Sequence, residues 1–491
     1  MPTSVGGDRS PVAPAWPRRT ALRRAAVTAA AAGFGGLGLA ACASAVRSGT
    51  APTAQSTILK VYYQINWQQS WNSLALRLCQ EFTDTYFNSK HKGVMAIPAP
   101  WGNSQGAVTQ IISGAPGAPA VLSSCCGDFF IARPVLANLT PLLRQDNLSS
   151  SLWSAGQLQT YQESSGLYGV PAYTACQPLI YNQTLFDTLG LPYPDPAWDY
   201  REAPAVWKSV SGPTKNGKHR YGTTFQWYPN YFDGSVFLLK GFGGEEMDPT
   251  HTICLMDSKA AITAGNWIYP LIWDKTMINR GGLGMEGAQA VLNGLTAMYQ
   301  SAGNMLFEAV NVLGTNIKWD VLPMPSWPVR RATNVQVDFY GVNAHYKNQE
   351  LAWELFKFVA ASTETNRFLI RSTLSFPNLV SMWSEWESIV RAVAPMTQHK
   401  QLKWWRIAAE QGYGYGHEFW RYLDPQAQSI MGAGISKIWN QKISVQGGYT
   451  QIAQQVTAFE KTAERATQRQ NAVSSLFPTR GPDVAPVATG L

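Results

Sequence analysis

The amino-acid sequence predicts an α/β protein that is built as two lobes. The chain has 491 residues, of which 45% are apolar, and this is enough to bury two hydrophobic cores. From residue 57 onward, short apolar runs of strand length alternate with segments whose apolar residues recur at helical spacing. Such alternation indicates βαβ units and parallel sheets. The longest apolar run lies near the N-terminus, which excludes a protein with several membrane spans.

Residues 1–41 are expected to be a targeting segment rather than part of the fold. Residues 17–24 are positively charged and contain paired arginines, and residues 25–41 follow without a single charge. The apolar run ends in Leu-Ala-Ala before Cys42, which resembles a bacterial lipobox, and the paired arginines resemble a Tat signal. The resemblance implies lipidation of Cys42 and a flexible tether at residues 42–56. Export by Sec and an uncleaved signal anchor remain alternatives.

Removal of the targeting segment changes the charge of the chain. The whole sequence has 39 basic and 31 acidic residues, a net charge of +8. The segment itself holds five Arg and one Asp, so 34 basic and 30 acidic residues remain, a net charge of +4. Because no run rich in Lys or Arg survives, nucleic acid is excluded as a partner.

The globular part begins with a strand and continues with alternating elements. Residues 58–65 alternate between apolar and polar side chains, as a strand does, and Leu74, Leu78 and Phe82 recur at helical spacing. Further strands are expected at 94–98, 120–122 and 179–182. Further helices are expected at 107–112, 184–189, 258–273, 350–362 and 450–468.

Several stretches follow one another in the order and spacing of a known family. They are residues 165–173, 179–186, 190–194, 294–299, 319–325 and 347–358. The first reads Ser-Gly-Leu-Tyr-Gly-Val-Pro-Ala-Tyr and the second Leu-Ile-Tyr-Asn-Gln-Thr-Leu-Phe. Over residues 57–470 the chain resembles the extracellular solute-binding proteins of bacterial ABC importers, in the sugar-binding branch.

The resemblance implies the two-lobe fold of periplasmic binding proteins, type II, with a ligand cleft and a hinge between the lobes. The chain is expected to cross the hinge near residues 173–177, 339–342 and 376–380. Each part of the chain is then assigned to a lobe or a tail. The assignments are 57–172 for the first part of lobe 1, 173–339 for the first part of lobe 2, 340–378 for the return to lobe 1, 379–470 for mostly lobe 2 helices and 471–491 for a flexible tail.

A sugar site needs aromatic plates and planar polar groups but no nucleophile, and the 19 Trp of the sequence suit this need. Candidate ligand contacts follow predicted strand ends or lie in the cleft loops that the resemblance implies. They are Trp67, Gln68, Asp128, Tyr173, Trp227, Tyr228, Gly303, Asn304, Asp338 and Tyr340. For each of them a role in the core, in a helix cap or on the surface remains the alternative.

Two positions depart from the family pattern. Asn304 stands where relatives often carry Trp, so a stacking plate is missing there. Residues 338–340, Asp-Phe-Tyr, stand where relatives are rich in Gly, which indicates an unusual ligand. Trp404-Trp405-Arg406 is expected to be a surface patch rather than a lid.

Motifs for catalysis and for metal binding are missing from the sequence. It contains no Gly-x-Ser-x-Gly, no His-Glu-x-x-His and no P-loop, and its six His show no metal-ligand spacing. The adjacent Glu245 and Glu246 do not form the facing pair of a glycosidase. Five cysteines remain after Cys42, an odd number, so at least one is free or pairs outside the chain. No enzyme, cofactor or metal is therefore expected.

The sequence thus predicts a monomeric, lipid-anchored receptor on the outer face of the cytoplasmic membrane. It is expected to capture a mono- or oligosaccharide and to dock on the membrane subunits of an ABC importer. The alternatives are a glycan-binding, glycan-hydrolysing or adhesive surface lipoprotein, or a receptor for glycerol phosphate, a peptide or a polyamine.

Overall fold

The computed structural model describes the following residues: 58–63, 76–87, 94–100, 104–115, 117–124, 130–131, 133, 135–158, 161–163, 165–173, 175–225, 236–249, 252–279, 287–300, 305–336, 338–412, 414–415 and 425–462. Residues from Ser56 on group into one compact unit.

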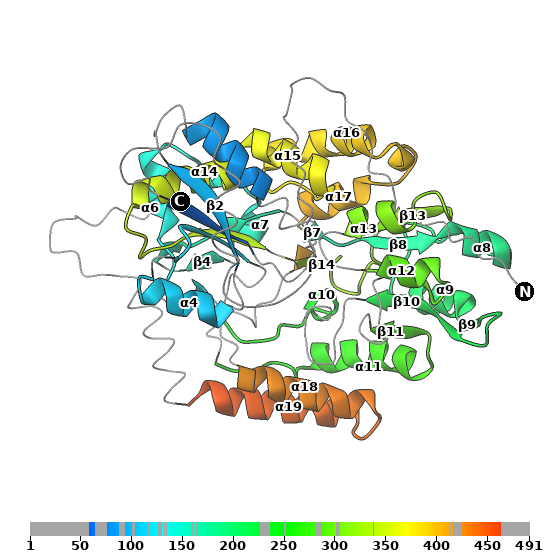
Figure 1. The fold of residues 1–491 in the computed structure, drawn as a ribbon. Helices are drawn as coiled ribbons and strands as arrows, with labels where there is room; N and C mark the ends of the chain where they lie inside the picture. The colour runs from blue at the N-terminus through cyan, green and yellow to red at the C-terminus, as the bar shows by residue number, and fades with distance from the viewer. Residues whose placement is uncertain are drawn as a thin grey trace, which may run out of the picture. The chain divides into compact units, whose positions relative to one another are not determined.

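The first sheet contains five strands in the order β2–β1–β3–β15–β6. Figure 1 labels its edge strand, β2. β1 lies between β2 and β3 and is parallel to both. β15 runs antiparallel to its neighbours β3 and β6. The strand bounds are β1 Ile58–Tyr63, β2 Met95–Pro100, β3 Val121–Ser124, β6 Val170–Pro171 and β15 Phe339–Val342.

The second sheet repeats this arrangement with different strands, in the order β11–β10–β12–β8–β13. β10 is parallel to β11 and β12, whereas β8 runs antiparallel to β12 and β13. The strand bounds are β8 Leu179–Asn182, β10 His219–Phe225, β11 Met277–Asn279, β12 Thr296–Tyr299 and β13 Trp319–Leu322. A short strand β9, Gly212–Pro213, pairs with β10, and β4, Gln162–Glu163, pairs with β5, Gly166–Leu167.

Two strands connect the two sheets and pair with each other. β7, Ala175–Cys176, follows β6 of the first sheet and precedes β8 of the second, and β14, Thr333–Gln336, follows β13 and precedes β15. β7 and β14 are antiparallel, and β16, Gly414–Tyr415, pairs with β14 on its other side. In each sheet, the fourth strand in the order given above is antiparallel, and it is the first strand after the chain arrives from the other sheet. These strands are β15 in the first sheet and β8 in the second. We call the β7–β14 pair the crossing ladder.

Two of the three segments that were expected to cross the hinge contain or follow the strands of the crossing ladder. Residues 173–177 contain β7, and residues 339–342 form β15 directly after β14. In residues 376–380, Asn378 Nδ2 donates to the carbonyl of Pro171 in β6, at 2.7 Å, and to that of Ala360, which is in the helix of residues 349–361, at 3.1 Å. The lobe boundaries themselves stay a prediction.

Helices cover both sheets, and local signals explain several of their ends. α11 begins after Ser258 and α14 after Asn348, and each of these side chains accepts a backbone N–H of the first turn. The helices expected at 258–273 and 350–362 are thus confirmed. The helix bounds are α4 Ser104–Ile112, α6 Leu139–Gln145, α7 Ala155–Leu158, α8 Gln183–Leu189, α9 Ala203–Val210, α10 Val236–Gly241, α11 Lys259–Trp273, α12 Gly287–Leu292, α13 Met305–Val312, α14 Gln349–Ala361, α15 Thr363–Thr373, α16 Trp383–Val393, α17 Lys403–Glu410, α18 Pro425–Trp439 and α19 Val445–Glu460. Short 3₁₀- or π-helices are η1 Phe82–Phe87, η2 Ser150–Leu152, η6 Val380–Met382 and η7 Pro395–Thr397.

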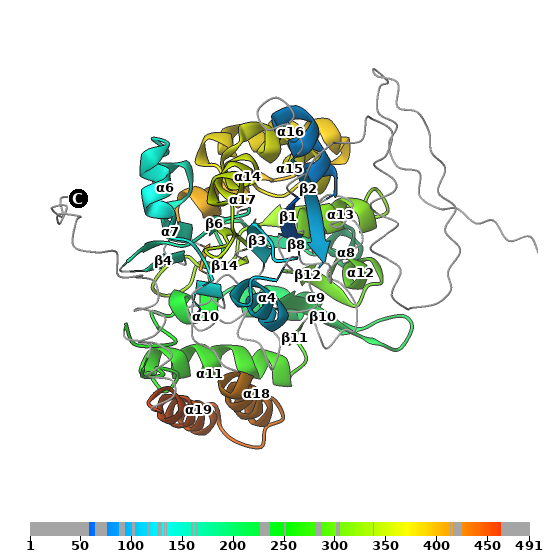
Figure 2. The same ribbon diagram turned by 60° about the vertical axis from the view of Figure 1, so that its left-hand side comes forward.

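Two clusters of buried apolar residues stabilise this arrangement. The first lies around the first sheet and α14, includes Cys176 and Val335 of the crossing ladder, and continues beneath α12, α13, α16 and α17. The second joins β10 to α9, α11, α18 and α19. Figure 2 shows α18 and α19 side by side along α11. Within the described ranges, no helix combines the length and the apolar character that a membrane span requires.

Candidate functional site

Three of the ten predicted ligand contacts belong to the described residues: Tyr173, Asp338 and Tyr340. The other seven lie outside the described residues and stay predictions, as does lipidation of Cys42. These seven are Trp67, Gln68, Asp128, Trp227, Tyr228, Gly303 and Asn304.

Tyr173 and Asp338 meet at one end of the crossing ladder. The hydroxyl of Tyr173 donates a hydrogen bond to Asp338 Oδ2 at 2.6 Å. The backbone carbonyl of Asp338 accepts from the N–H of Ala172 at 2.7 Å, which fixes the chain where β14 turns into β15. Tyr173 and Asp338, 165 positions apart in sequence, are thus brought together next to the paired strands β7 and β14.

The carboxyl of Asp338 keeps one oxygen free. Within the described residues, its Oδ1 is buried and has no hydrogen-bond partner. Burial raises the pKa of Asp338 from 3.8 to about 6, and the hydrogen bond from Tyr173 opposes this increase. At neutral pH the group is therefore an anion, and Oδ1 can accept a hydrogen bond from a hydroxyl or an ammonium group.

Tyr340 lies two residues further along the chain than Asp338. It is in β15 between Ser123 of β3 and Val170 of β6, and only 2% of it is exposed. Its side chain belongs to the first hydrophobic core, and a contact of Tyr340 with the ligand stays a prediction.

Sequence reasoning missed a cluster of buried polar side chains in and beside the crossing ladder. Gln300 Nε2 donates to the carbonyl of Gln177 at 3.0 Å and to Thr333 Oγ1 at 3.2 Å, and Asn334 Nδ2 donates to Gln177 Oε1 at 3.2 Å. Among the described residues, Gln177 Nε2, Gln300 Oε1 and Asn334 Oδ1 are buried without a partner. The available signal was polar residues directly after apolar strands, at Gln177 and Gln300.

Helix α17 packs on the crossing ladder and is tied to β13 of the second sheet. The N–H of Gln401 donates to Asp320 Oδ1 at 2.8 Å, and Lys400 Nζ donates to the carbonyl of Trp319. Burial raises the pKa of Asp320, and these contacts oppose the increase. The loop before α17 therefore connects α16 to the second sheet.

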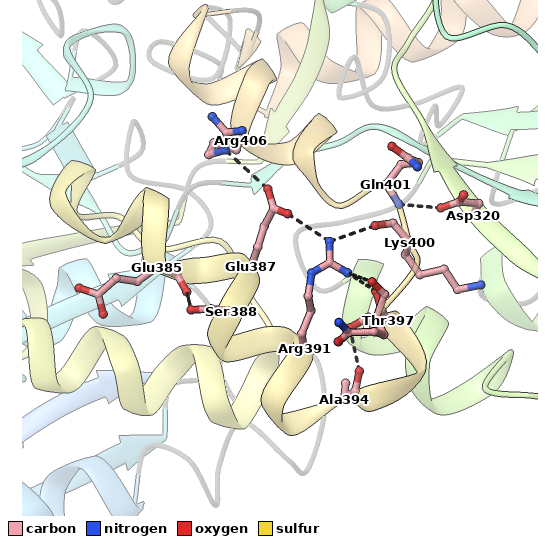
Figure 3. A network of polar contacts seen from close by, with 11 residues as sticks. Asp320, Glu385, Glu387, Ser388, Arg391, Ala394, Thr397, Lys400, Gln401 and Arg406 are labelled. Carbon is pink, nitrogen blue, oxygen red and sulfur yellow. Dashed lines mark hydrogen bonds and ion pairs between the residues drawn. The ribbon is translucent and has the colours of Figure 1, made fainter.

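A network of ion pairs holds α16 and α17 together (Figure 3). Arg391 donates to the carbonyls of Thr397 and Gln398 and, at 3.2 Å, to Glu387. Arg406 lies between Glu387, at 3.6 Å, and Glu410, at 2.9 Å. The expected surface patch at residues 404–406 is wrong for Trp405, which is only 4% exposed and belongs to the first core.

The described thiols are buried, and the two adjacent glutamates lie in different surroundings. Cys79, Cys176 and Cys254 are free and buried, and burial raises the pKa of each thiol to about 12. Glu245 forms an ion pair with Lys240, whereas Glu246 is fully buried. In the part of the chain that the structure describes, no group of three or more His, Cys, Asp or Glu could hold a metal ion.

Comparison with known proteins identifies the class to which this fold belongs. Residues 68–365 match the profile of the bacterial extracellular solute-binding proteins, and the chain belongs to this family. No curated protein matches the chain by sequence.

Solved structures of similar fold come from several bacteria. An ABC substrate-binding protein of Listeria monocytogenes in complex with cycloalternan is 17% identical, with 82% of this chain and 99% of that chain covered and a TM-score of 0.64. The GacH receptor of Streptomyces glaucescens, solved unliganded and with acarbose, is 17% identical and has a TM-score of 0.61. The match covers 83% of this chain and 98% of that chain. UgpB of Mycobacterium tuberculosis with glycerophosphocholine is 17% identical, with 82% and 98% covered and a TM-score of 0.63. The predicted two-lobe fold of periplasmic binding proteins is thereby confirmed.

Proposed function

We propose that this chain is an extracellular receptor that captures a mono- or oligosaccharide between its two lobes and delivers it to an ABC importer. The observation that carries the proposal is the free carboxylate oxygen of Asp338, placed where the chain crosses between the sheets. Sugars offer many hydroxyl donors, and an ionised acceptor makes stronger hydrogen bonds than a neutral one. The ligands bound to the Listeria and Streptomyces proteins support a carbohydrate.

In this proposal Asp338 accepts a hydroxyl of the sugar, and Tyr173 holds the carboxylate in place. Oδ1 is buried in the present conformation, so a ligand reaches it when the lobes move apart at the crossing ladder. Trp67 and Trp227 would supply stacking plates, with Gln68, Asp128, Tyr228, Gly303 and Asn304 nearby. Binding stabilises the closed state, and no bond of the ligand is broken.

We also propose that lipid on Cys42 holds this receptor, as a monomer, at the outer face of the cytoplasmic membrane. Metabolic labelling with palmitate tests the anchor. The wild-type chain should carry the label and the Cys42→Ala variant should not. A labelled Cys42→Ala protein would refute the assignment.

A thermal-shift screen of the chain from residue 43 on tests the receptor function. The panel contains monosaccharides, oligosaccharides, glycerophosphodiesters, polyamines and peptides. A ligand at about 100 times its dissociation constant should add about 2.7 kcal/mol to the free energy of unfolding. Stabilisation by one carbohydrate family without turnover supports the proposal, and turnover of a glycan supports a hydrolase instead.

A glycerophosphodiester with a cationic head group is the second candidate ligand. UgpB, of similar fold, is solved with glycerophosphocholine. A quaternary ammonium group would also suit the anionic Asp338. Among the described residues, its carboxylate accepts a hydrogen bond from the hydroxyl of Tyr173 and from no cationic side chain. The same panel separates the two candidates, since glycerophosphocholine and a neutral oligosaccharide are tested side by side.

A further inference from the structure

Lysines gather at one corner of the second sheet, where three segments of the chain meet. The segments are the end of α9 with the β9–β10 hairpin, the turn between α11 and β11, and the turn between α18 and α19. His219 Nε2 lies 2.8 Å from the carbonyl oxygen of Lys275, and Trp273 Nε1 donates to the carbonyl of Trp439 at 3.2 Å. Figure 1 shows β9 and the turn between α18 and α19 on the side where α11 ends. The three segments therefore form one surface.

This surface holds the positive excess of the chain. Residues 203–220, 273–276 and 436–443 contain seven Lys or Arg and one Asp, a net charge of +6. The whole chain after residue 41 has a net charge of only +4, so the remainder is slightly acidic. We call the exposed lysines of the three ranges the lysine corner. Its members are Lys208, Lys215, Lys218, Lys275, Lys437 and Lys442.

Acidic side chains neutralise little of this charge. Lys208 Nζ lies 3.5 Å from Asp274 Oδ2, and the two side chains are 73% and 41% exposed. An ion pair as exposed as this one contributes little to stability. Among the described residues, the other five lysines of the corner take part in no ion pair. The lysine corner therefore presents a positive field to solvent.

The kind of cation favours an extended anionic surface over a single bound anion. Lysine is a flexible, strongly hydrated point charge, whereas arginine is preferred where one phosphate or carboxylate is held by two parallel hydrogen bonds. The arginine of this region, Arg220, is engaged by the backbone, since its Nε donates to the carbonyl of Val210 at 2.6 Å. Groups of about four to eight basic residues attract the head groups of anionic lipids. The number and the type of the cations thus fit a lipid surface.

The proposed lipid on Cys42 would keep such a surface within reach. Residues 43–57 separate Cys42 from the start of β1 at Ile58, and a stretch of this length spans at most about 50 Å. A tethered partner is present at high local concentration, so weak attraction by several lysines is enough to hold it. A membrane is for this reason favoured over an acidic protein or a nucleic acid, which would have to arrive by diffusion.

We propose that the lysine corner binds the surface of a membrane that contains anionic phospholipids. The ammonium groups lie against the lipid phosphates, and this contact sets the orientation of the globular part on the membrane. The inference goes beyond the capture of a solute and does not depend on which ligand the cleft takes. The anchor on Cys42 would strengthen the contact, but the lysine corner needs no anchor to prefer an anionic bilayer.

Cosedimentation with lipid vesicles tests the proposal. The chain from residue 43 on is used, because it lacks the anchor and keeps the whole compact unit that begins at Ser56. One set of vesicles is phosphatidylcholine alone, and the other contains an equal share of phosphatidylglycerol. The test variant carries one substitution in each of the three segments: Lys218→Gln, Lys275→Gln and Lys442→Gln.

The matched control variant removes three exposed lysines elsewhere and has the same net charge. Its substitutions are Lys259→Gln, Lys347→Gln and Lys461→Gln. Lys259 begins α11 and Lys461 follows α19, so both lie at the ends of these helices away from the corner, and Lys347 follows β15 of the first sheet. Thermal melts of both variants without lipid establish that they are folded.

We expect the wild-type chain to bind vesicles with phosphatidylglycerol at least about tenfold more tightly than vesicles without it. Each lysine near such a surface contributes about fivefold to binding. The test variant should therefore bind at least about tenfold more weakly than wild type, and the control variant less than about threefold more weakly. Binding should fall steeply between about 0.1 M and 1 M salt, because the Debye length falls from about 10 Å to about 3 Å.

Acetylation of the wild-type chain keeps the proposal testable if the test variant fails to fold. Vesicles with phosphatidylglycerol should protect Lys218, Lys275 and Lys442 from acetylation, and the three lysines of the control variant should stay reactive. Equal protection of both sets, equal losses in the two variants, or equal binding to the two kinds of vesicle would overturn the proposal. Binding of poly-glutamate or of a DNA duplex to wild type, without binding to vesicles, would overturn it in favour of an acidic protein or a nucleic acid. None of these outcomes changes the result of the carbohydrate screen.

Discussion

Replacement of Asp338 by Asn should stabilise the folded protein at neutral pH. Burial raises the pKa of this carboxyl from 3.8 to about 6. An acid of this kind holds its proton more tightly in the folded state than in the unfolded state, so the folded state is favoured at low pH. This stabilisation is fully present below about pH 4 and is lost as the pH rises through about 6. Asn has the same shape and cannot ionise.

The magnitude follows from the difference between the two pKa values. About two pKa units correspond to about 3 kcal/mol, which is the most that ionisation of Asp338 can cost at pH 7. Denaturant unfolding of both proteins at a series of pH values measures it. All other groups titrate alike in the two proteins, so the difference between their free energies of unfolding reports Asp338 alone. The difference should shift in favour of Asp338→Asn by up to about 3 kcal/mol between pH 4 and pH 7.

Tyr173→Phe is the matched control for this experiment. Its hydroxyl donates to Asp338 Oδ2, and this hydrogen bond lowers the pKa of Asp338. Without the hydroxyl the pKa should rise further, so the loss of stability should move to higher pH. A difference between wild type and Asp338→Asn that is independent of pH would refute this reasoning, and so would a shift in favour of the wild type.

Two further predictions concern the packing of the fold. Cys176 and Val335 lie opposite each other in the crossing ladder and form no backbone hydrogen bonds with each other, because the N–H of the next residue, Gln177, donates to the carbonyl of Asn334. The Cα atoms of such a pair are about 4.5 Å apart, within the range that a disulfide spans. Val335→Cys should therefore give a disulfide between positions 176 and 335 after oxidation, and a peptide map without this crosslink would contradict the register. Gly448→Leu should destabilise the chain by about 1–3 kcal/mol in a thermal melt, because a Cβ at this position would lie 2.3 Å from Ile438 Cγ1. Gly156→Ala should change the stability little, because its Cβ would meet no atom nearer than 4.0 Å. Equal effects of the two substitutions would contradict the close contact of α18 and α19.

Local patterns in the sequence predicted where helices lie better than they predicted which strands pair with each other. The helices at α11 and α14 follow from apolar spacing and from Ser258 and Asn348 as N-caps. The pairing of β7 with β14 joins residues about 160 positions apart, and no local periodicity encodes it. The contacts made by two-residue strands such as β7 arise only when the whole fold is assembled.

The candidate site shows the same limit. Asp338 and Tyr173 were each predicted as ligand contacts, but nothing in the sequence indicated that they would bond each other. The buried amides of Gln177 and Gln300 depend on packing between distant segments. Trp405 was expected in a surface patch with Trp404 and Arg406, yet it lies in the first core.

Asp338 connects the stability of the fold to its proposed function, because its ionised form lowers stability and supplies the acceptor for a sugar hydroxyl. The most direct test is a calorimetric titration of the best carbohydrate from the screen into wild type and Asp338→Asn at pH 7.5, a pH above the pKa of Asp338 at about 6. The account predicts saturable binding to wild type and affinity at least about tenfold lower in the variant. Equal affinities, or no carbohydrate binding while a glycerophosphodiester binds, would contradict it.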